Sequence, residues 1–276
     1  MTGARLLRRT AFIVFLAAVL IFALFPLYYA LTTSVTPSGQ LFRAELFPAQ
    51  WTAAHYRGIL AGHFLRNILN SAVVSAAVVA LTLVLGLGAA YAIARIRFRG
   101  RAAVLLGVLA ISMFPQVAVL AGMFELIRSL GLFDSLGALI FSYLTLTLPF
   151  AVWVLATFMR GIPVELEEAA ALDGASPLTT LVRVFLPLLQ PALVATGLLV
   201  FIAAWNEFLF ALTFTLSDQS RTVPVAIALL SGASAYELPW GAIMAAAVLV
   251  TLPIVVLALV FQRHIVSGLL AGAVKR

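Results

Sequence analysis

Cysteine is absent from this 276-residue sequence, and charged side chains make up only 10% of it. Without cysteine the chain forms no disulfide and has no thiolate metal ligand, and its three histidines are too scattered to predict a metal site. A soluble domain typically carries about 25% charged residues. Because 64% of the side chains are hydrophobic, we expect an integral membrane protein.

Lysine is almost absent as well, which excludes a nucleotide-hydrolysing site. A Walker A loop needs a lysine directly after its glycines, and the only lysine here is Lys275, next to the C-terminus. The sequence also lacks a Gly-x-Ser-x-Gly motif, a zincin helix and a carboxylate pair on one plausible face. We therefore expect no enzyme activity, no bound metal and no cofactor held by this chain.

The net charge of +7 does not indicate a nucleic-acid partner, because the basic residues stand in short clusters between apolar runs. Six such runs occupy about 11–31, 66–94, 102–127, 135–159, 192–215 and 240–261. Each is long enough to cross a bilayer as a helix in contact with lipid, and the first is too long for the apolar region of a signal peptide. The sequence thus predicts an all-α, polytopic membrane protein with about six transmembrane helices.

Arginine placement predicts how these spans cross the membrane. Four arginines share one short connector: Arg95, Arg97, Arg99 and Arg101. Since cytoplasmic loops carry an excess of basic residues, we expect this connector and both termini to be cytoplasmic. The predicted organisation is a first transmembrane helix and external loop in 1–65, a transmembrane core in 66–264 and a cytoplasmic tail in 265–276.

The longest acidic interruption of the apolar sequence lies between the fourth and fifth runs. Pro163 suits the first turn of a helix, and the acidic residues that follow place negative charge near its positive end: Glu165, Glu167 and Glu168. Asp173-Gly174 suits a left-handed helix end, and Ser176-Pro177 suits the cap and first position of a new helix. The segment is predicted to fold as helix, tight turn and helix.

Glu168-Ala169-Ala170 is followed after three residues by Gly174 and later by Leu186-Pro187. This spacing resembles the E-A-A loop of permease subunits of ABC importers. The resemblance implies a type I ABC importer permease fold in which 161–190 is the cytoplasmic coupling loop, held in a cleft of the ATPase subunit. It assigns this coupling to Glu167, Glu168, Ala169, Ala170, Asp173, Gly174, Leu186 and Pro187. Without the resemblance, the segment would be an ordinary amphipathic connector.

Two further strings resemble carbohydrate-type importers of this family. Trp205-Asn206-Glu207-Phe208 is similar to sugar permeases, and the C-terminal residues resemble the tail of the maltose-type second permease. In the family that tail reaches between the two ATPase subunits, which here would involve Gly272 and Lys275. The resemblance implies a bacterial inner-membrane subunit that works with a second homologous permease, an ATPase dimer that uses ATP and Mg²⁺, and an extracytoplasmic solute-binding protein that delivers a sugar.

Polar residues inside the apolar runs mark a candidate pathway for the sugar. Gln116 follows Pro115, which is expected to kink the third span, and Asn206 and Glu207 stand in the fifth. An ionisable residue in an apolar helix is costly, so Glu207 is a functional candidate. It is equally consistent with a role in the pathway and with a structural hydrogen bond to another helix.

Two alternative functions remain at this point: an importer permease for another solute, such as a polyamine or peptide, and a stand-alone secondary transporter. The coupling loop does not distinguish among solutes, so the choice of sugar depends on the resemblance alone. A secondary transporter would need intramembrane ionisable residues and usually internal repeats. Glu207 is a lone candidate and no repeat is visible, so the importer is favoured.

Overall fold

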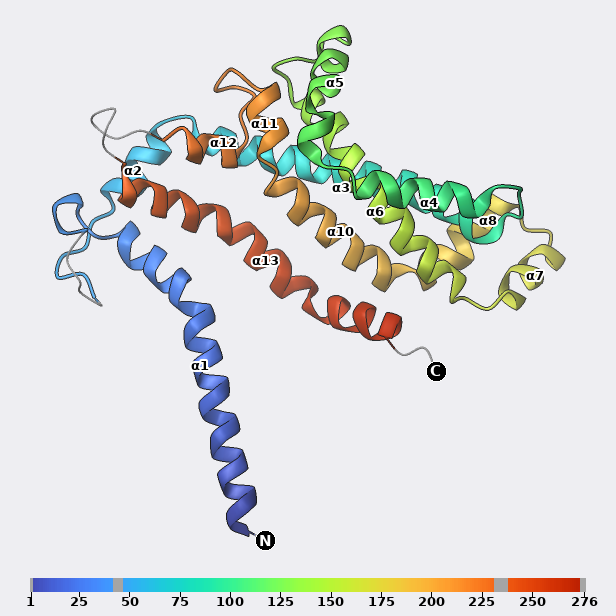
Figure 1. The fold of residues 1–276 in the computed structure, drawn as a ribbon, viewed down its shortest axis with the longest axis horizontal. Helices are drawn as coiled ribbons and strands as arrows, with labels where there is room; N and C mark the ends of the chain where they lie inside the picture. Colours follow the sequence, from blue (N-terminus) through green and yellow to red (C-terminus); the bar gives the residue numbers. More distant parts are fainter. Residues whose placement is uncertain (1, 42–46, 231–237, 274–276) are drawn as a thin grey trace. The chain divides into compact units, whose positions relative to one another are not determined.

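Helices dominate the chain wherever its structure is described. The computed structural model describes residues 2–41, 47–230 and 238–273, and these ranges contain no strand (Figure 1). Within them, four helices contain segments long and apolar enough to cross a membrane: α1 (Thr2–Ser34), α3 (Phe64–Arg95), α6 (Leu136–Arg160) and α13 (Trp240–Ala273). Two bent helix pairs raise the candidate spans to as many as six. The predicted all-α fold with about six spans is confirmed.

The kink expected at Pro115 is a complete break. α4 (Arg101–Ser112) ends before this proline and α5 (Gln116–Ser129) begins after it, and the two helices are bent by 95°. Proline has no N–H to donate to the preceding turn and disfavours helical conformation in the residue before it. The predicted third span is therefore two helices rather than one curved helix.

The predicted fifth span, 192–215, is interrupted inside and preceded by a sharp bend. The bend, of 80°, separates Pro177–Leu188 from α10 (Gln190–Trp205), which has Pro191 in its first turn. α10 ends at Trp205, and α11 (Leu209–Phe214) begins after a short interruption. The interruption places Glu207 at a helix break instead of inside a continuous span.

The remaining elements are short connecting helices. They are η1 (Ser38–Gln40), α2 (Ala54–Ala61), α7 (Glu165–Leu172), α8 (Pro177–Thr180), η2 (Leu181–Phe185), α9 (Leu186–Leu188) and α12 (Val223–Ala228). The chain forms two compact units, one of residues 1–65 with 226–253 and the other of residues 66–225 with 254–276.

In the first unit, polar contacts join the end of α1 to α2. The hydroxyls of Ser34 and Tyr56 lie 2.8 Å apart, and His55 Nε2 lies 2.9 Å from the carbonyl oxygen of Thr36. The His55 ring also lies so close to Gly241 of α13 that a Cβ would not fit there. The most apolar 18-residue stretch of α1 has no buried residue in the described structure, so lipid or another protein must cover it.

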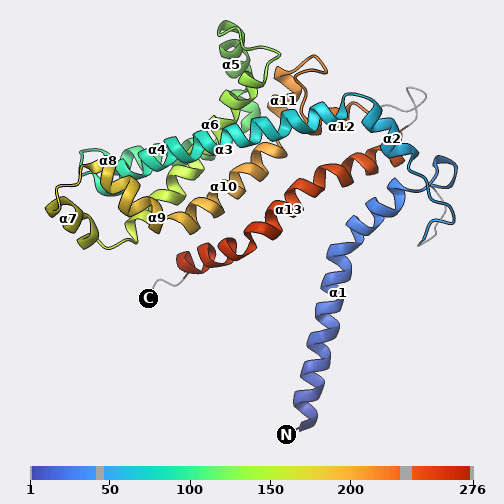
Figure 2. The same ribbon diagram turned by 180° about the vertical axis from the view of Figure 1, so that it is seen from behind.

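In the second unit, α3, α6 and α10 run side by side in both views (Figures 1 and 2). They enclose two apolar cores, one including Tyr143 and Phe214 and the other including Leu155 and Phe185. α5 and α11 lie at one end of this helix bundle, and α7 lies at the opposite end. The candidate coupling helix and the break that holds Glu207 are thus at opposite ends of the same bundle.

Small and hydroxylated residues bring α3 and α6 close together. A Cβ added at Gly86 of α3 would lie 3.5 Å from the Cβ of Ala151 on α6. One turn earlier, the hydroxyls of Thr82 and Thr147 lie 2.8 Å apart in a buried hydrogen bond. Such close packing and interhelical hydrogen bonding stabilise helix pairs in membranes, so α3 and α6 form a firm support for the loop that follows α6.

Candidate functional site

The candidate coupling helix α7 ends in a turn that depends on glycine. Gly174 has a φ of +79°, in the left-handed region. The N–H of Ala175 donates to the carbonyl of Ala170 over 2.9 Å, and the N–H of Gly174 donates to that of Ala171 over 3.0 Å. This pair of bonds is the Schellman motif. α8 begins shortly after it, so the helix, tight turn and helix expected from the sequence are present.

Two adjacent glutamates of α7 have different surroundings. Glu167 is partly buried: its Oε1 accepts a hydrogen bond of 3.1 Å from the Tyr91 hydroxyl, and its Oε2 lies 3.8 Å from Nε of Arg95. Glu168 is exposed, and its side chain has no hydrogen bond or ion pair with the described part of the chain. Glu167 is thus held by the chain's own α3, whereas Glu168 is accessible to another protein.

Most of the other residues assigned to coupling lie on an open surface. Asp173 and Gly174 are exposed with Ala169, while Ala170 is partly buried. An apolar side chain beside them, Leu172, is 89% exposed. Glu168 and Leu172 are therefore both accessible at this end of the bundle.

Leu186 and Pro187 lie away from this surface, in α9, which follows η2 directly. Pro187 has no N–H to donate to the carbonyl of Arg183, four residues earlier, so the regular α-helical bond is unavailable there. η2 is a π-helical turn, a form that accommodates such a missing bond and is frequent at functional sites. The regular α-helix is therefore interrupted by η2 shortly before the bend that leads into α10.

Glu207 is buried at the break between α10 and α11. Its carboxylate accepts hydrogen bonds from the N–H groups of Phe210, at 2.8 Å, and Ala211, at 3.1 Å, and so caps the first turn of α11. Nε2 of Gln116 on α5 donates to the same carboxylate over 2.7 Å. Asn206 is exposed and donates to a carbonyl of its own helix. The structure brings Gln116 and Glu207 together and leaves Asn206 apart.

Gln116 also lines a cavity of about 340 Å³ between α4, α5 and α6. Its walls are mostly apolar, and Thr145 is the other polar side chain that lines it. A sugar needs several convergent hydrogen-bond partners, because a buried hydroxyl without a partner is costly. This cavity alone therefore does not make a sugar site.

The two residues predicted to contact the ATPase from the tail differ in what the structure describes. Gly272 lies in the final turn of α13, because this helix continues through Ala273. Lys275 lies outside the described residues.

The described ranges contain no group of three or more histidine, aspartate or glutamate side chains close enough together to hold a metal ion.

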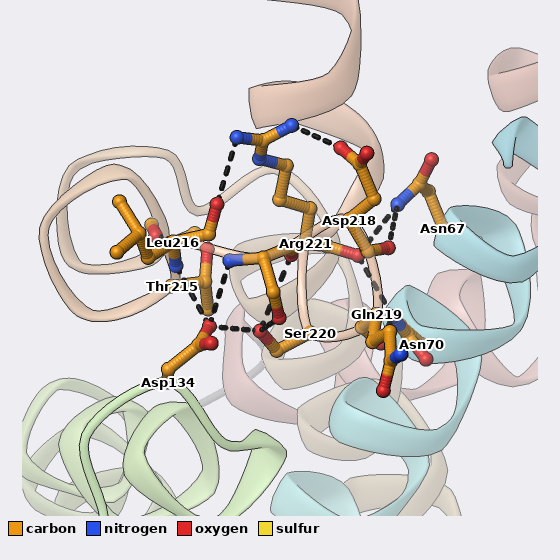
Figure 3. A network of polar contacts seen from close by, with 11 residues as sticks. Asn67, Asn70, Asp134, Thr215, Leu216, Asp218, Gln219, Ser220 and Arg221 are labelled. Atoms are coloured by element: carbon orange, nitrogen blue, oxygen red, sulfur yellow. Dashed lines mark hydrogen bonds and ion pairs between the residues drawn. The ribbon is translucent and has the colours of Figure 1, made fainter.

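A polar network orders the loop after α11 (Figure 3). Asn67 and Asn70 of α3 donate their side-chain amides to carbonyls of this loop, the bond from Asn70 to Gln219 measuring 2.8 Å. From the other side, Asp134 Oδ1 accepts hydrogen bonds from the N–H groups of Leu216 and Ser217, at 2.8 and 3.0 Å, and from the hydroxyl of Ser220. Sequence analysis missed this network, because the polar residues that form it are far apart in the chain.

The charge of Asp134 is stabilised by these bonds. Burial alone raises the pKa of its carboxyl, but the hydrogen bonds from Ser220, Leu216 and Ser217 together outweigh burial and hold the pKa well below its ordinary value. Folding therefore favours the ionised form. The resulting stabilisation is complete above about pH 4, the pKa of an aspartate in an unfolded chain, and is lost as the pH falls toward the folded-state value.

We expect Asp134→Asn to loosen the loop at neutral pH. Asparagine tolerates the positive φ of 57° at this position, but its uncharged amide oxygen accepts the bonds that Asp134 Oδ1 receives more weakly than a carboxylate oxygen does. Amides of residues 215–221 should exchange with deuterium faster in the variant than in the wild type at pH 7. The difference should shrink as the pH falls below about 4, because protons then bind the opened form in preference to the folded carboxylate and remove the stabilisation. Equal exchange at neutral pH would contradict the role given to Asp134.

The sequence matches a known protein family over most of its length. The family described as "Binding-protein-dependent transport system inner membrane component" matches residues 82–270. The trehalose/maltose transport system permease protein MalG of Thermococcus litoralis is 42% identical, over 98% of both chains. The trehalose transport system permease protein SugB of Mycobacterium tuberculosis is 41% identical, over 99% of both chains.

The fold has a counterpart among solved structures. It is similar, with a TM-score of 0.82, to a chain in the crystal structure of a bacterial ABC transporter involved in the import of the acidic polysaccharide alginate. The match covers 95% of this chain and 98% of the other, at 22% sequence identity. At this identity the likeness concerns the fold, and it confirms the architecture expected from the E-A-A loop.

Proposed function

Because the chain belongs to the family of binding-protein-dependent transport system inner membrane components, we propose that it is a permease subunit of an ATP-driven sugar importer. In this role it forms part of the pathway by which the sugar crosses the membrane. The observation that carries the sugar assignment is the similarity over the whole chain to permeases named for trehalose and maltose transport. Sulfoquinovosyl glycerol and diacetylchitobiose permeases, at 39% and 35% identity, support a carbohydrate substrate class.

The proposed importer contains a second homologous permease, a dimer of ATPase subunits and an extracytoplasmic solute-binding protein. A related fold occurs in a crystal structure of an alginate ABC transporter in complex with an alginate pentasaccharide-bound periplasmic protein, with a TM-score of 0.67. The uncovered apolar span of α1 supports a neighbour within the membrane, which lipid or the second permease would supply. In this assembly ATP and Mg²⁺ act in the ATPase subunits, and the present chain is a non-catalytic subunit that binds no cofactor.

The loop 161–190 is proposed to couple ATP hydrolysis to transport by placing α7 in a cleft of the ATPase. Support comes from the exposed Glu168 and the 89% exposed Leu172, which lie beside the turn at Gly174. In this arrangement, Glu168 pairs with a basic residue of the ATPase. The exposed Arg97 and Arg99 support a cytoplasmic location for this end of α3, and the proposal places both termini on the same side of the bacterial inner membrane.

Two further roles follow from the same proposal. Asn206, with its exposed side chain, contributes to one wall of the pathway, while Gln116 and Glu207 support that wall through their mutual hydrogen bond. Gly272 and Lys275 contact the ATPase subunits from the C-terminal end. Because this chain offers few convergent polar groups, the second permease is expected to hold most of the contacts that select the sugar.

Uptake by the assembled importer tests this function. The chain would be reconstituted in proteoliposomes with its second permease, ATPase and binding protein, and radiolabelled trehalose and maltose would be supplied outside. We expect uptake that needs internal ATP and Mg²⁺ and that spermidine and short peptides do not compete. Competition by spermidine or a peptide, without uptake of either sugar, would show that the solute class is wrong. Uptake without the ATPase would indicate a secondary transporter instead.

A further inference from the structure

Arg95, which the sequence singles out only as a marker of topology, connects four elements at the end of the bundle that carries α7. It is the last residue of α3, and its side chain is 9% exposed. Its Nη2 donates to the carbonyl oxygens of Met159, at 2.6 Å, and Ile162, at 2.5 Å, where α6 ends. Its Cζ lies 4.9 Å from the centre of the Phe185 ring in η2. Its Nε lies 3.8 Å from Glu167 Oε2 in α7.

These contacts suit arginine and no other residue. The last carbonyls of a helix lack partners within the helix and form its negative end, so a cation that donates to them satisfies and stabilises the end of α6. A guanidinium can donate in its plane while an aromatic ring faces it, whereas a lysine ammonium is a single compact charge. Arg95 therefore holds the ends of α3 and α6 together and at the same time faces η2 and α7.

α7 lies directly against η2 and α8, but it is joined to α3 by few polar contacts. None of its residues is fully buried, and a helix of eight residues is not stable in isolation. Within the described residues, every hydrogen bond or ion pair between α7 and α3 involves Glu167, which meets Tyr91 and Arg95 on one face of α3. Tyr91 also packs edge-on against Phe185, with ring centres 5.7 Å apart. Glu167 is thus the polar link from α7 to the Arg95 group.

The link between Arg95 and Glu167 is incomplete in this conformation. Nε of Arg95 is buried and has no hydrogen-bond partner in the described structure, and 3.8 Å is too long for such a bond. A buried donor without a partner is unfavourable. A movement of α7 toward α3 by about 1 Å would let the Glu167 carboxylate accept from Nε. Displacement of α7 in this direction would therefore supply a hydrogen bond that this conformation lacks.

We propose that Arg95 is the positioning residue through which the coupling loop moves the membrane helices: pressure on α7 closes the Arg95–Glu167 contact, and α3, the end of α6 and η2 then move with α7. This inference rests on the proposed function, since it gives α7 an ATPase to contact. It gives the two adjacent glutamates different roles. Glu168 contacts the ATPase, and Glu167 transmits the displacement of α7 to α3 through Arg95.

The test uses Arg95→Met, which keeps the length of the side chain but cannot donate a hydrogen bond, in the complete importer. Sugar imported and ATP hydrolysed are measured together in proteoliposomes. We expect import to fall about tenfold, the scale of a lost hydrogen bond to a charged group, while ATP hydrolysis stays within about twofold of the wild type. Arg95→Lys should recover part of the import. The exposed Arg160, replaced by methionine, controls for loss of a basic residue at this end of the bundle and should import normally.

A double-mutant comparison separates positioning from simple stability. Combining Arg95→Met with Glu167→Gln should lower import no further than Arg95→Met alone, because both remove the same link. Combining it with Glu168→Gln should multiply the two effects. Equal loss of import and ATP hydrolysis in Arg95→Met would show a merely structural role and overturn the proposal, as would independent effects of Arg95 and Glu167.

Failure of the proposed function can be recognised separately. Hydrogen exchange of residues 165–172 in the purified complex reports the attachment of α7 whether or not any sugar is transported. We expect Arg95→Met to speed this exchange and Arg160→Met to leave it unchanged. If the wild-type complex imports no sugar but the exchange differs as expected, the substrate is wrong and the attachment of α7 holds. Unchanged exchange in Arg95→Met would overturn the attachment itself.

Discussion

Replacing Gly174 with valine is expected to lower sugar import about tenfold while the importer still hydrolyses ATP, since a left-handed residue other than glycine costs about 1–2 kcal/mol. The φ of +79° at Gly174 is especially unfavourable for a β-branched side chain. A Cβ at this position would meet no other atom within 4 Å, so the cost comes from the backbone and not from a clash inside the chain. To relieve it, the Schellman turn must open and α7 must change its direction.

The matched control is Gly174→Asn. Asparagine adds a side chain of similar size but adopts the left-handed conformation far more readily than valine. We expect this variant to keep most of its import, measured with ATP hydrolysis in the same proteoliposomes. Equal losses in the two variants would assign the effect to side-chain bulk at the ATPase surface. Wild-type import by Gly174→Val would show that the turn has no part in coupling.

The turn was predictable because its signals are local. The acidic residues in the first turn of α7, Gly174 at its end and Ser176 before Pro177 each act on the backbone within a few residues. Pro163, which was expected in the first turn, instead precedes α7, which begins at Glu165. The apolar runs are also local signals, since their length alone indicates helices that cross a membrane. Both predictions needed no knowledge of which helices are neighbours.

Contacts between distant residues were not predictable in this way. Arg95 meets Met159 and Ile162, 64 and 67 positions later in the chain, and an arginine at the end of an apolar run equally marks a cytoplasmic loop. Pro115 is compatible with either a kink or a full break, and the 95° bend at this position depends on how α4 and α5 pack against the rest of the bundle. The local sequence limits the conformations that a segment can adopt, and the packing of distant helices determines which of them forms.

Replacing Glu207 with alanine is expected to destabilise the protein by about 3 kcal/mol, because a cap and a charge-assisted hydrogen bond are lost together at a buried position. The N–H groups of Phe210 and Ala211 would lose the acceptor that starts α11, and the side-chain amide of Gln116 would lose its partner at the break between α10 and α11. Thermal unfolding of the purified protein in detergent should show a lower midpoint than the wild type. Import should fall in proportion to the folded protein that remains.

Two neighbouring substitutions decide between a structural role and a role in the pathway. Glu207→Gln retains one carbonyl oxygen for the α11 cap, so its unfolding midpoint should lie between those of the wild type and Glu207→Ala. Asn206→Ala removes an exposed side chain that bonds only within its own helix, and its midpoint should match the wild type. If Glu207→Ala unfolded like the wild type yet imported sugar poorly, Glu207 would act on the sugar rather than on the fold. If the unfolding midpoint instead falls with Glu207→Ala and falls less with Glu207→Gln, the carboxylate stabilises the fold by hydrogen bonds that connect α5 with the break between α10 and α11.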